Sequence, residues 1–82
     1  MKLPRDLSGS EVARLLERHY GYRVARTKGS HMTLELTVRG RVHHVTVPQH
    51  ADIRVGTLNA IIGDVAEFHS LTTREVRDTL FA

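Results

Sequence analysis

This chain of 82 residues contains six histidines, which can act as acid–base groups, hydrogen-bond partners or metal ligands. One of them, His31, follows Lys28, Gly29 and Ser30, so an imidazole stands directly after a cation and a glycine-bearing turn. Histidine has an unperturbed pKa of about 6.5, so both protonation states are populated near neutral pH and acid–base catalysis is accessible. Lys28 and the free amides of such a turn can hold a phosphate. The string therefore predicts an acid–base group beside an anion site.

The other histidines are each open to a plainer interpretation. His44 is either a second acid–base group or a cross-strand partner for Glu35. His50 is the other candidate for an auxiliary acid–base group, and it lies in a polar loop whose position the spacing does not define. His43 is expected to pack or hydrogen-bond at the edge of the core, and an ordinary exposed strand histidine is the alternative for His31. Because the chain has no cysteine and no His-x-x-His or His-Glu-x-x-His string, we expect neither a metal nor another cofactor.

Positive charge is concentrated in the first half of the chain. The net charge is +3, yet residues 1–47 carry nine Lys and Arg against four Asp and Glu, whereas residues 48–82 carry three against five. The two halves are therefore +5 and −2. This asymmetry predicts a polyanion on one surface and a protein on another, with an ordinary solvated surface as the alternative.

The length of the chain allows one domain with one modest core. We therefore expect residues 1–82 to fold as a single unit. No apolar stretch approaches the length of a membrane span, and residues 1–6 lack the apolar core of a signal peptide. A cytoplasmic protein without membrane contact is expected.

The first helix is indicated by its start and stop signals. Ser8 and Glu11 form a capping box, which predicts a helix from Gly9 to a stop at Gly21. The stripe that faces the core is expected to comprise Val12, Leu15 and Leu16, with His19 at its boundary.

Two more helices are expected after the strands. The second begins near Gly56 or Thr57, and its apolar positions at helical spacing are Leu58, Ile61, Ile62, Val65 and Phe68. Thr72 and Glu75 repeat the capping box and predict a short third helix at the end of the chain.

Alternating side chains predict three strands, at residues 22–27, 31–38 and 41–47. In the middle strand one face carries Met32, Leu34, Leu36 and Val38, and the other carries His31, Thr33, Glu35 and Thr37. Strict alternation in the first strand places Tyr22 and Val24 on one face and Arg23, Ala25 and Thr27 on the other.

A tight turn at Arg39-Gly40 sets the register of the last two strands and places Glu35 opposite His44. Because both flanking helices bury an apolar stripe, one sheet face is covered and the other stays open. The predicted fold class is α+β, with the order α-β-β-β-α, a three-stranded antiparallel sheet, helices on one face and a short C-terminal third helix.

Several strings of this chain together resemble one known family. They are Gly21-Tyr22, Arg26-Thr27-Lys28-Gly29-Ser30-His31, Val45-Thr46-Val47-Pro48 with His50 behind it, and Val55-Gly56-Thr57-Leu58. In this order and spacing they resemble the HicA family of toxin ribonucleases from HicAB toxin–antitoxin systems. The resemblance runs from about Ser8 to Phe68 and leaves residues 69–82 as a helical extension.

The resemblance implies a fold, an activity and a partner. The implied fold is that of double-stranded-RNA-binding domains, and the implied activity is metal-independent cleavage of messenger RNA that depends on His31. The implied partner is a cognate HicB antitoxin, which blocks the same surface.

The expected RNA contacts lie on the strands and their turns. Lys28, Gly29 and Ser30 are expected to hold the scissile phosphate, and neighbouring phosphates are expected to contact Arg23, Arg26, Arg39 and Arg41. The second helix carries Asp64 and Glu67 where the family often carries Lys or Arg, which argues against RNA contact by that helix.

Two other functions fit the same residues. A non-catalytic RNA-binding module would use the open face without cleavage, and a protein-interaction domain would use the acidic second half. The third helix is free to contact an antitoxin or to support a homo-oligomer.

Overall fold

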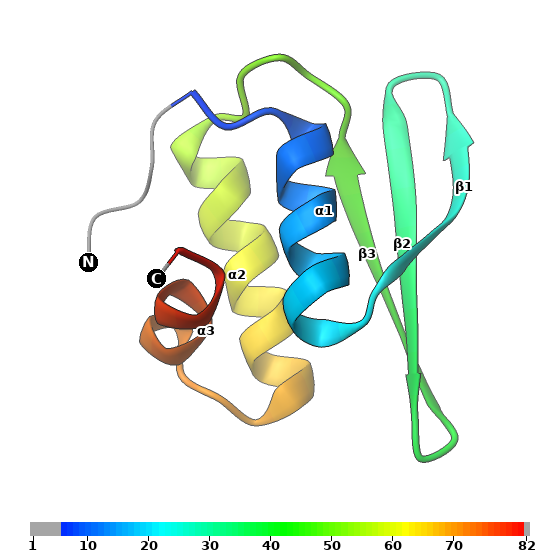
Figure 1. Cartoon of the computed structure of the whole chain (residues 1–82), viewed down its shortest axis with the longest axis vertical. Coiled ribbons are helices and arrows are strands. Elements are labelled where there is room, and N and C mark those ends of the chain that lie inside the picture. The colour runs from blue at the N-terminus through cyan, green and yellow to red at the C-terminus, as the bar shows by residue number, and fades with distance from the viewer. Residues whose placement is uncertain (1–5, 82) are drawn as a thin grey trace.

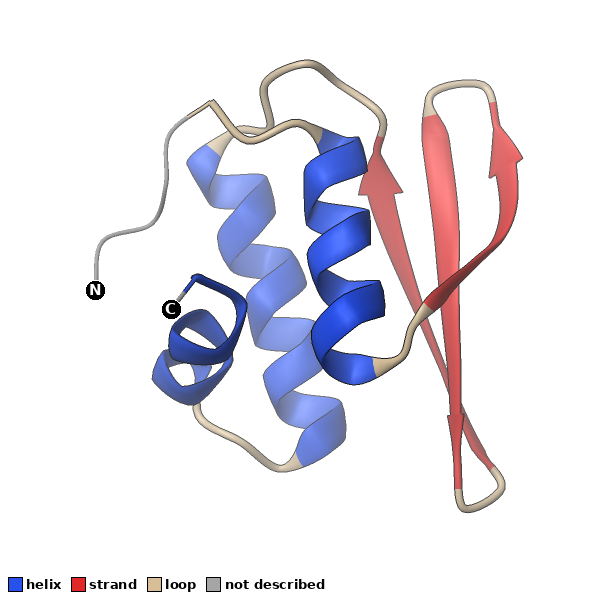
Figure 2. Ribbon diagram, in the orientation of Figure 1, coloured by secondary structure: helices blue, strands red, loops and turns tan. Residues whose placement is uncertain are grey.

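The computed structural model describes residues 6–81 and contains three helices and a three-stranded sheet (Figure 1). In chain order the elements are α1 (Gly9–Tyr20), β1 (Arg23–Lys28), β2 (His31–Val38), β3 (Arg41–Pro48), α2 (Val55–His69) and α3 (Thr73–Phe81). The helices lie on one side of the molecule and the sheet on the other (Figure 2). The predicted α+β class and element order are confirmed.

The capping boxes form as predicted. The Ser8 hydroxyl accepts from the Glu11 amide at 3.1 Å, and the Glu11 carboxylate accepts from the Ser8 amide at 3.0 Å. Thr72 and Glu75 form the same reciprocal pair before α3, at 3.1 and 2.9 Å. Each box satisfies two backbone donors that a helix start otherwise leaves free. Gly21 adopts a left-handed φ of 83° and ends α1 as expected.

The sheet has the order β1-β2-β3, and both strand pairs are antiparallel. The register of β2 against β3 is the predicted one, with Glu35 opposite His44. Arg39 and Gly40 both have positive φ, 50° and 78°, as a two-residue type I′ turn requires. Because the buried positions of β2 are even-numbered, its odd-numbered residues lie on the face turned away from the core, here called the open face.

One cluster of buried side chains lies between the helices and the sheet. Its largest fully buried members are Tyr22, Leu16, Leu34, Leu58, Ile62, Val12, Val45, Val47, Val65 and Val76. All residues of β1 are exposed by contrast, because this strand lies at the outer edge of the sheet, farthest from α2 (Figure 1). In the described part of the chain, none of the helices is both long and apolar enough to cross a membrane.

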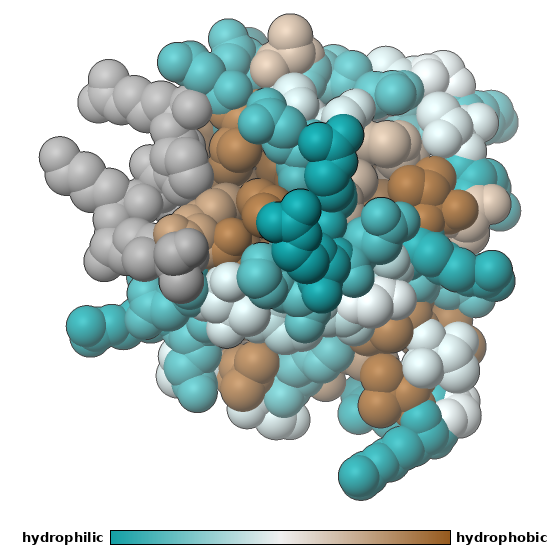
Figure 3. Space-filling model, viewed as in Figure 1, coloured by the Kyte–Doolittle hydropathy of each residue, from teal (hydrophilic) through white to brown (hydrophobic). Residues whose placement is uncertain are grey.

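The buried face of α1 differs from the predicted stripe, because its buried residues are Gly9, Val12, Ala13 and Leu16. The Gly9 amide donates to the His50 carbonyl at 2.9 Å, and the missing side chain lets the helix approach the backbone of Pro48. This contact turns the side of α1 that carries Gly9 and Ala13 toward the core, which leaves His19 on the side facing solvent. The prediction that His19 lies at the core boundary was therefore wrong, because His19 is exposed. The outward side of α1 is largely hydrophilic (Figure 3).

Candidate nucleic-acid interface

A β-bulge in β1 decides which cations share the open face. The register against β2 shifts between Val24 and Arg26, so Ala25 is an extra residue in this strand. The alternation predicted past Ala25 was therefore wrong. Arg26 and Lys28 return to the face on which Arg23 lies, and all three pair with odd-numbered residues of β2. The bulge thus forms a row of three exposed cations along the open face.

His31 lies at the end of this row. It is exposed and pairs directly with Lys28 across the turn, where Gly29 has a φ of 59°. The Ser30 carbonyl accepts a hydrogen bond from the Gln49 amide, which ties the turn to the loop after β3. The structure therefore brings together the histidine, the lysine and the turn amides that the sequence placed at one site.

The two auxiliary histidines lie in different surroundings. His44 is on the open face, and its Nε2 is 3.9 Å from the Glu35 carboxylate, which matches the cross-strand alternative for this histidine. Glu35 lies four residues along β2 from His31, about 13 Å at the rise of a strand, so this pair is remote from His31. His50 is exposed and directly follows Gln49, the residue bound to the turn.

Arg39 and Arg41 lie at the opposite end of the sheet. The length of β2, roughly 23 Å at the rise of a strand, separates them from His31. Arg41 is on the covered side of the sheet because it pairs with Val38, and its guanidinium carbon lies 4.7 Å from the centre of the Phe68 ring. The structure therefore does not gather these two arginines with the other expected RNA contacts.

A second polar cluster, which the sequence reasoning missed, surrounds Tyr22. This side chain is fully buried, and its hydroxyl lies 2.6 Å from Nδ1 of His43 and 3.2 Å from Nε2 of His69. His43 Nε2 is 3.4 Å from the Asp64 carboxylate, and its ring stacks on Phe68 at 4.4 Å. The expectation that His43 hydrogen-bonds at the core edge is confirmed. Unlike His43, His69 lies in no sequence pattern that predicts a hydrogen bond, because it is the last residue of α2.

With both imidazoles neutral, these hydrogen bonds have one consistent direction. The Asp64 carboxylate lies 3.4 Å from Nε2 of His43 and favours the proton on that nitrogen, so Nδ1 of His43 accepts from the Tyr22 hydroxyl. The Tyr22 oxygen then accepts from Nε2 of His69. Burial, with a smaller contribution from the charge of Asp64, raises the pKa of Tyr22 far above its ordinary value and keeps this hydroxyl protonated. Every group in the chain of hydrogen bonds has a partner, as buried polar groups require.

The stability of the protein should depend on the protonation of His69. Burial, with a smaller contribution from His43, lowers the pKa of His69 below its ordinary value of 6.5. The unfolded chain then binds the proton more readily than the folded one. Stability is therefore complete above about pH 6.5, declines as the pH falls from there to the lowered pKa, and levels off below it. We expect this decline to be smaller in His69→Gln, and urea unfolding at a series of pH values measures both slopes.

The matched control for this experiment is His19→Gln, which removes an exposed histidine outside the network. It should retain the wild-type dependence of the unfolding free energy on pH. Equal slopes for the wild type and His69→Gln would contradict the role assigned to His69.

The fold and the site define a small α+β protein that presents a histidine and a row of cations on an open sheet face. A family model described as the HicA toxin of bacterial toxin–antitoxin systems matches residues 9–66. The chain belongs to this family, whose toxins have a cognate antitoxin as partner. Comparisons with curated proteins and with solved structures gave no match.

Proposed function

We propose that this HicA-family toxin is a ribonuclease that cleaves messenger RNA and uses His31 in proton transfer. The observation that supports this most is the exposed imidazole of His31 beside Lys28 and the Gly29–Ser30 turn, at the end of a row of cations. Membership of the HicA family supports the same assignment. RNA phosphates are bound by such exposed cations through charge, and a histidine beside them can then act on the bound strand.

The reaction that this site suits requires two proton transfers. A base removes the proton of the 2′-hydroxyl, and the 2′-oxygen attacks phosphorus. The bond from phosphorus to the 5′-oxygen breaks, and an acid protonates that leaving oxygen. The products are a 2′,3′-cyclic phosphate and a free 5′-hydroxyl. His31 supplies one of the two transfers, and Lys28 stabilises the negative charge that develops on the phosphoryl oxygens.

We assign the second proton transfer to His50 rather than to His44. His44 is held by Glu35 at a distance along β2 from His31. His50 follows Gln49, whose amide donates to the Ser30 carbonyl, so this loop lies against the turn that carries His31. The antitoxin that we expect, of the HicB type, inhibits the toxin by covering this same open face.

An RNA with a single 2′-deoxy position tests the proposed reaction. The purified toxin, in the presence of a chelator, should cut the all-ribose oligonucleotide and leave the bond after the deoxy position intact, because that sugar lacks the attacking oxygen. Analysis of the ends by mass spectrometry should show cyclic phosphates. Cleavage after the deoxy position would exclude this mechanism, and binding without any cleavage would favour a non-catalytic RNA-binding module.

A further inference from the structure

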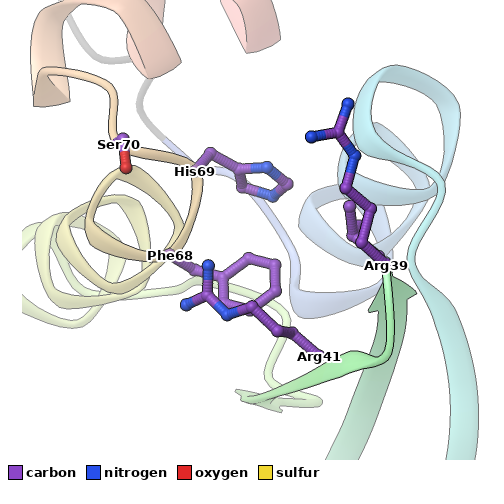
Figure 4. Close-up of a pocket in the computed structure, with 6 residues that line it drawn as sticks. Arg39, Arg41, Phe68, His69 and Ser70 are labelled. Carbon is purple, nitrogen blue, oxygen red and sulfur yellow. The ribbon is translucent and has the colours of Figure 1, made fainter.

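The end of the molecule opposite His31 contains a pocket lined by two arginines. The pocket has a volume of about 290 Å³ and lies between the β2–β3 turn and the end of α2. Arg39 and Arg41 line it from the turn side, Phe68 and His69 line it from the last turn of α2, and Ser70 directly follows that helix (Figure 4). We refer to it as the tip pocket.

Within residues 6–81, neither guanidinium group of the tip pocket lies within 4.0 Å of a carboxylate. The close contacts between basic and acidic side chains in this part of the chain are those of His43 with Asp64 and of His44 with Glu35. Contact with the face of Phe68 holds the Arg41 guanidinium in place without neutralising its charge. The pocket therefore presents two full positive charges in an orientation that is partly fixed.

An anion in this pocket would also meet the C-terminal end of α2, which carries the negative end of the helix dipole. That end corresponds to roughly half of one negative charge, which is less than the two full positive charges of the arginines. The balance of charge therefore favours an anionic ligand.

Guanidinium groups match the oxygens of phosphate and can bind two of them at once. The pocket volume is close to the lower limit of small-ligand pockets, about 300 Å³, which is enough for one phosphate with its sugar. Arg23 is the cation of β1 nearest to this end of the sheet, because it pairs with Glu35, three residues before the end of β2 at Val38. Arg23 lies on the open face, so a strand bound along β1 reaches the tip pocket by passing around the β2–β3 turn to the covered side.

We propose that the tip pocket binds a phosphodiester of the RNA strand, several nucleotides from the bond at His31. This inference rests on the proposed function, since it assumes that RNA lies along the open face. The pocket would act as a second anchor, so that a long RNA binds more tightly than a short one that reaches only the His31 end.

Uridine oligomers carrying 2′-O-methyl groups test this inference, because they lack the attacking hydroxyl and stay intact whether or not the protein is a ribonuclease. A trinucleotide should reach only one end of the sheet, whereas an oligomer of roughly 12 nucleotides falls within the site sizes of single-strand-binding domains. Fluorescence anisotropy would measure both affinities for the wild type, for Arg39→Gln/Arg41→Gln, and for the control Arg74→Gln/Arg77→Gln. The control removes the same charge from α3.

The double tip variant should bind the trinucleotide as the wild type does and the long oligomer roughly tenfold more weakly, as removal of charged hydrogen bonds implies. Its plot of log affinity against log salt should be shallower by about 0.7, the contribution of the one phosphate that the variant no longer neutralises. The α3 variant should resemble the wild type. Because Arg41 also packs on Phe68, Arg39→Gln alone is measured as well and should show part of the same weakening.

Equal affinity of the wild type and both tip variants for the long oligomer would overturn the inference and leave the ribonuclease proposal standing. Equal weakening in the tip and α3 variants would also overturn it, because the effect would then be one of net charge. Binding of inorganic phosphate at His69, seen by NMR, with unchanged oligomer affinity would overturn it too and assign the pocket to free phosphate. Absence of RNA binding in every protein would reject both proposals.

Discussion

His31→Ala is expected to lower the rate of RNA cleavage by about 10²- to 10⁴-fold, the usual contribution of one acid–base group. The alanine variant keeps Lys28 and the Gly29–Ser30 turn, so RNA binding should change little. Because the His31 side chain is exposed, its removal costs little packing and the melting temperature should stay close to that of the wild type. Rates measured at saturating RNA, together with a thermal unfolding curve, separate a defect in chemistry from a defect in folding.

His44→Ala is the matched control for this experiment. It removes another exposed histidine from the open face, but one paired with Glu35. Cleavage by this variant should remain within a few-fold of the wild type, whereas His50→Ala should share part of the His31 defect. If His31→Ala cleaves as fast as the wild type, His31 takes no part in proton transfer.

Gly9→Ala is expected to lower the free energy of unfolding by about 3 kcal/mol, at the upper end of the range for overpacking. A methyl group at Gly9 would overlap the carbonyl oxygen of Pro48 and lie 3.0 Å from the Cα of Gln49. Both are backbone atoms, so relief requires movement of the whole loop after β3. That loop also holds Ser30 through Gln49, so the variant should lose cleavage activity as well as stability.

Gly63→Ala is the matched control in the same kind of element. Apart from its chain neighbours and the adjacent backbone of α2, no atom of residues 6–81 lies within 4 Å of the position that its methyl group would occupy, and the residue is inside α2. Alanine is the better helix former, so this variant should be more stable than the wild type by roughly 0.5 to 1 kcal/mol. Urea unfolding of both variants measures the two opposite changes. A Gly9→Ala protein as stable as the wild type would refute the close approach of α1 to Pro48.

The helix starts and the β2–β3 register follow from local signals in the sequence. The capping boxes at Ser8 and Thr72 depend on residues three apart, and the Arg39-Gly40 turn fixes the register of β2 against β3. Interactions of such short range need no knowledge of the rest of the fold. The same applies to His31, because its alternation with apolar neighbours and its distance from a glycine turn are both local properties.

The tertiary structure alone decided how the remaining functional groups are distributed. The bulge at Ala25 arises from pairing with β2, and it moves Arg26 to the open face against the alternation that the sequence suggests. The network of Tyr22, His43 and His69 joins residues 21 and 47 positions apart, a separation over which spacing carries no information.

The fold class and the place of His31 on the open face were thus determined by the sequence itself, because periodicity and caps are encoded within a few residues. Packing decided three other features: the distance of Arg39 and Arg41 from His31, the buried face of α1 around Gly9, and the tip pocket. Each depends on which face of a strand or helix contacts an element distant in the sequence, and these contacts form only when the core packs.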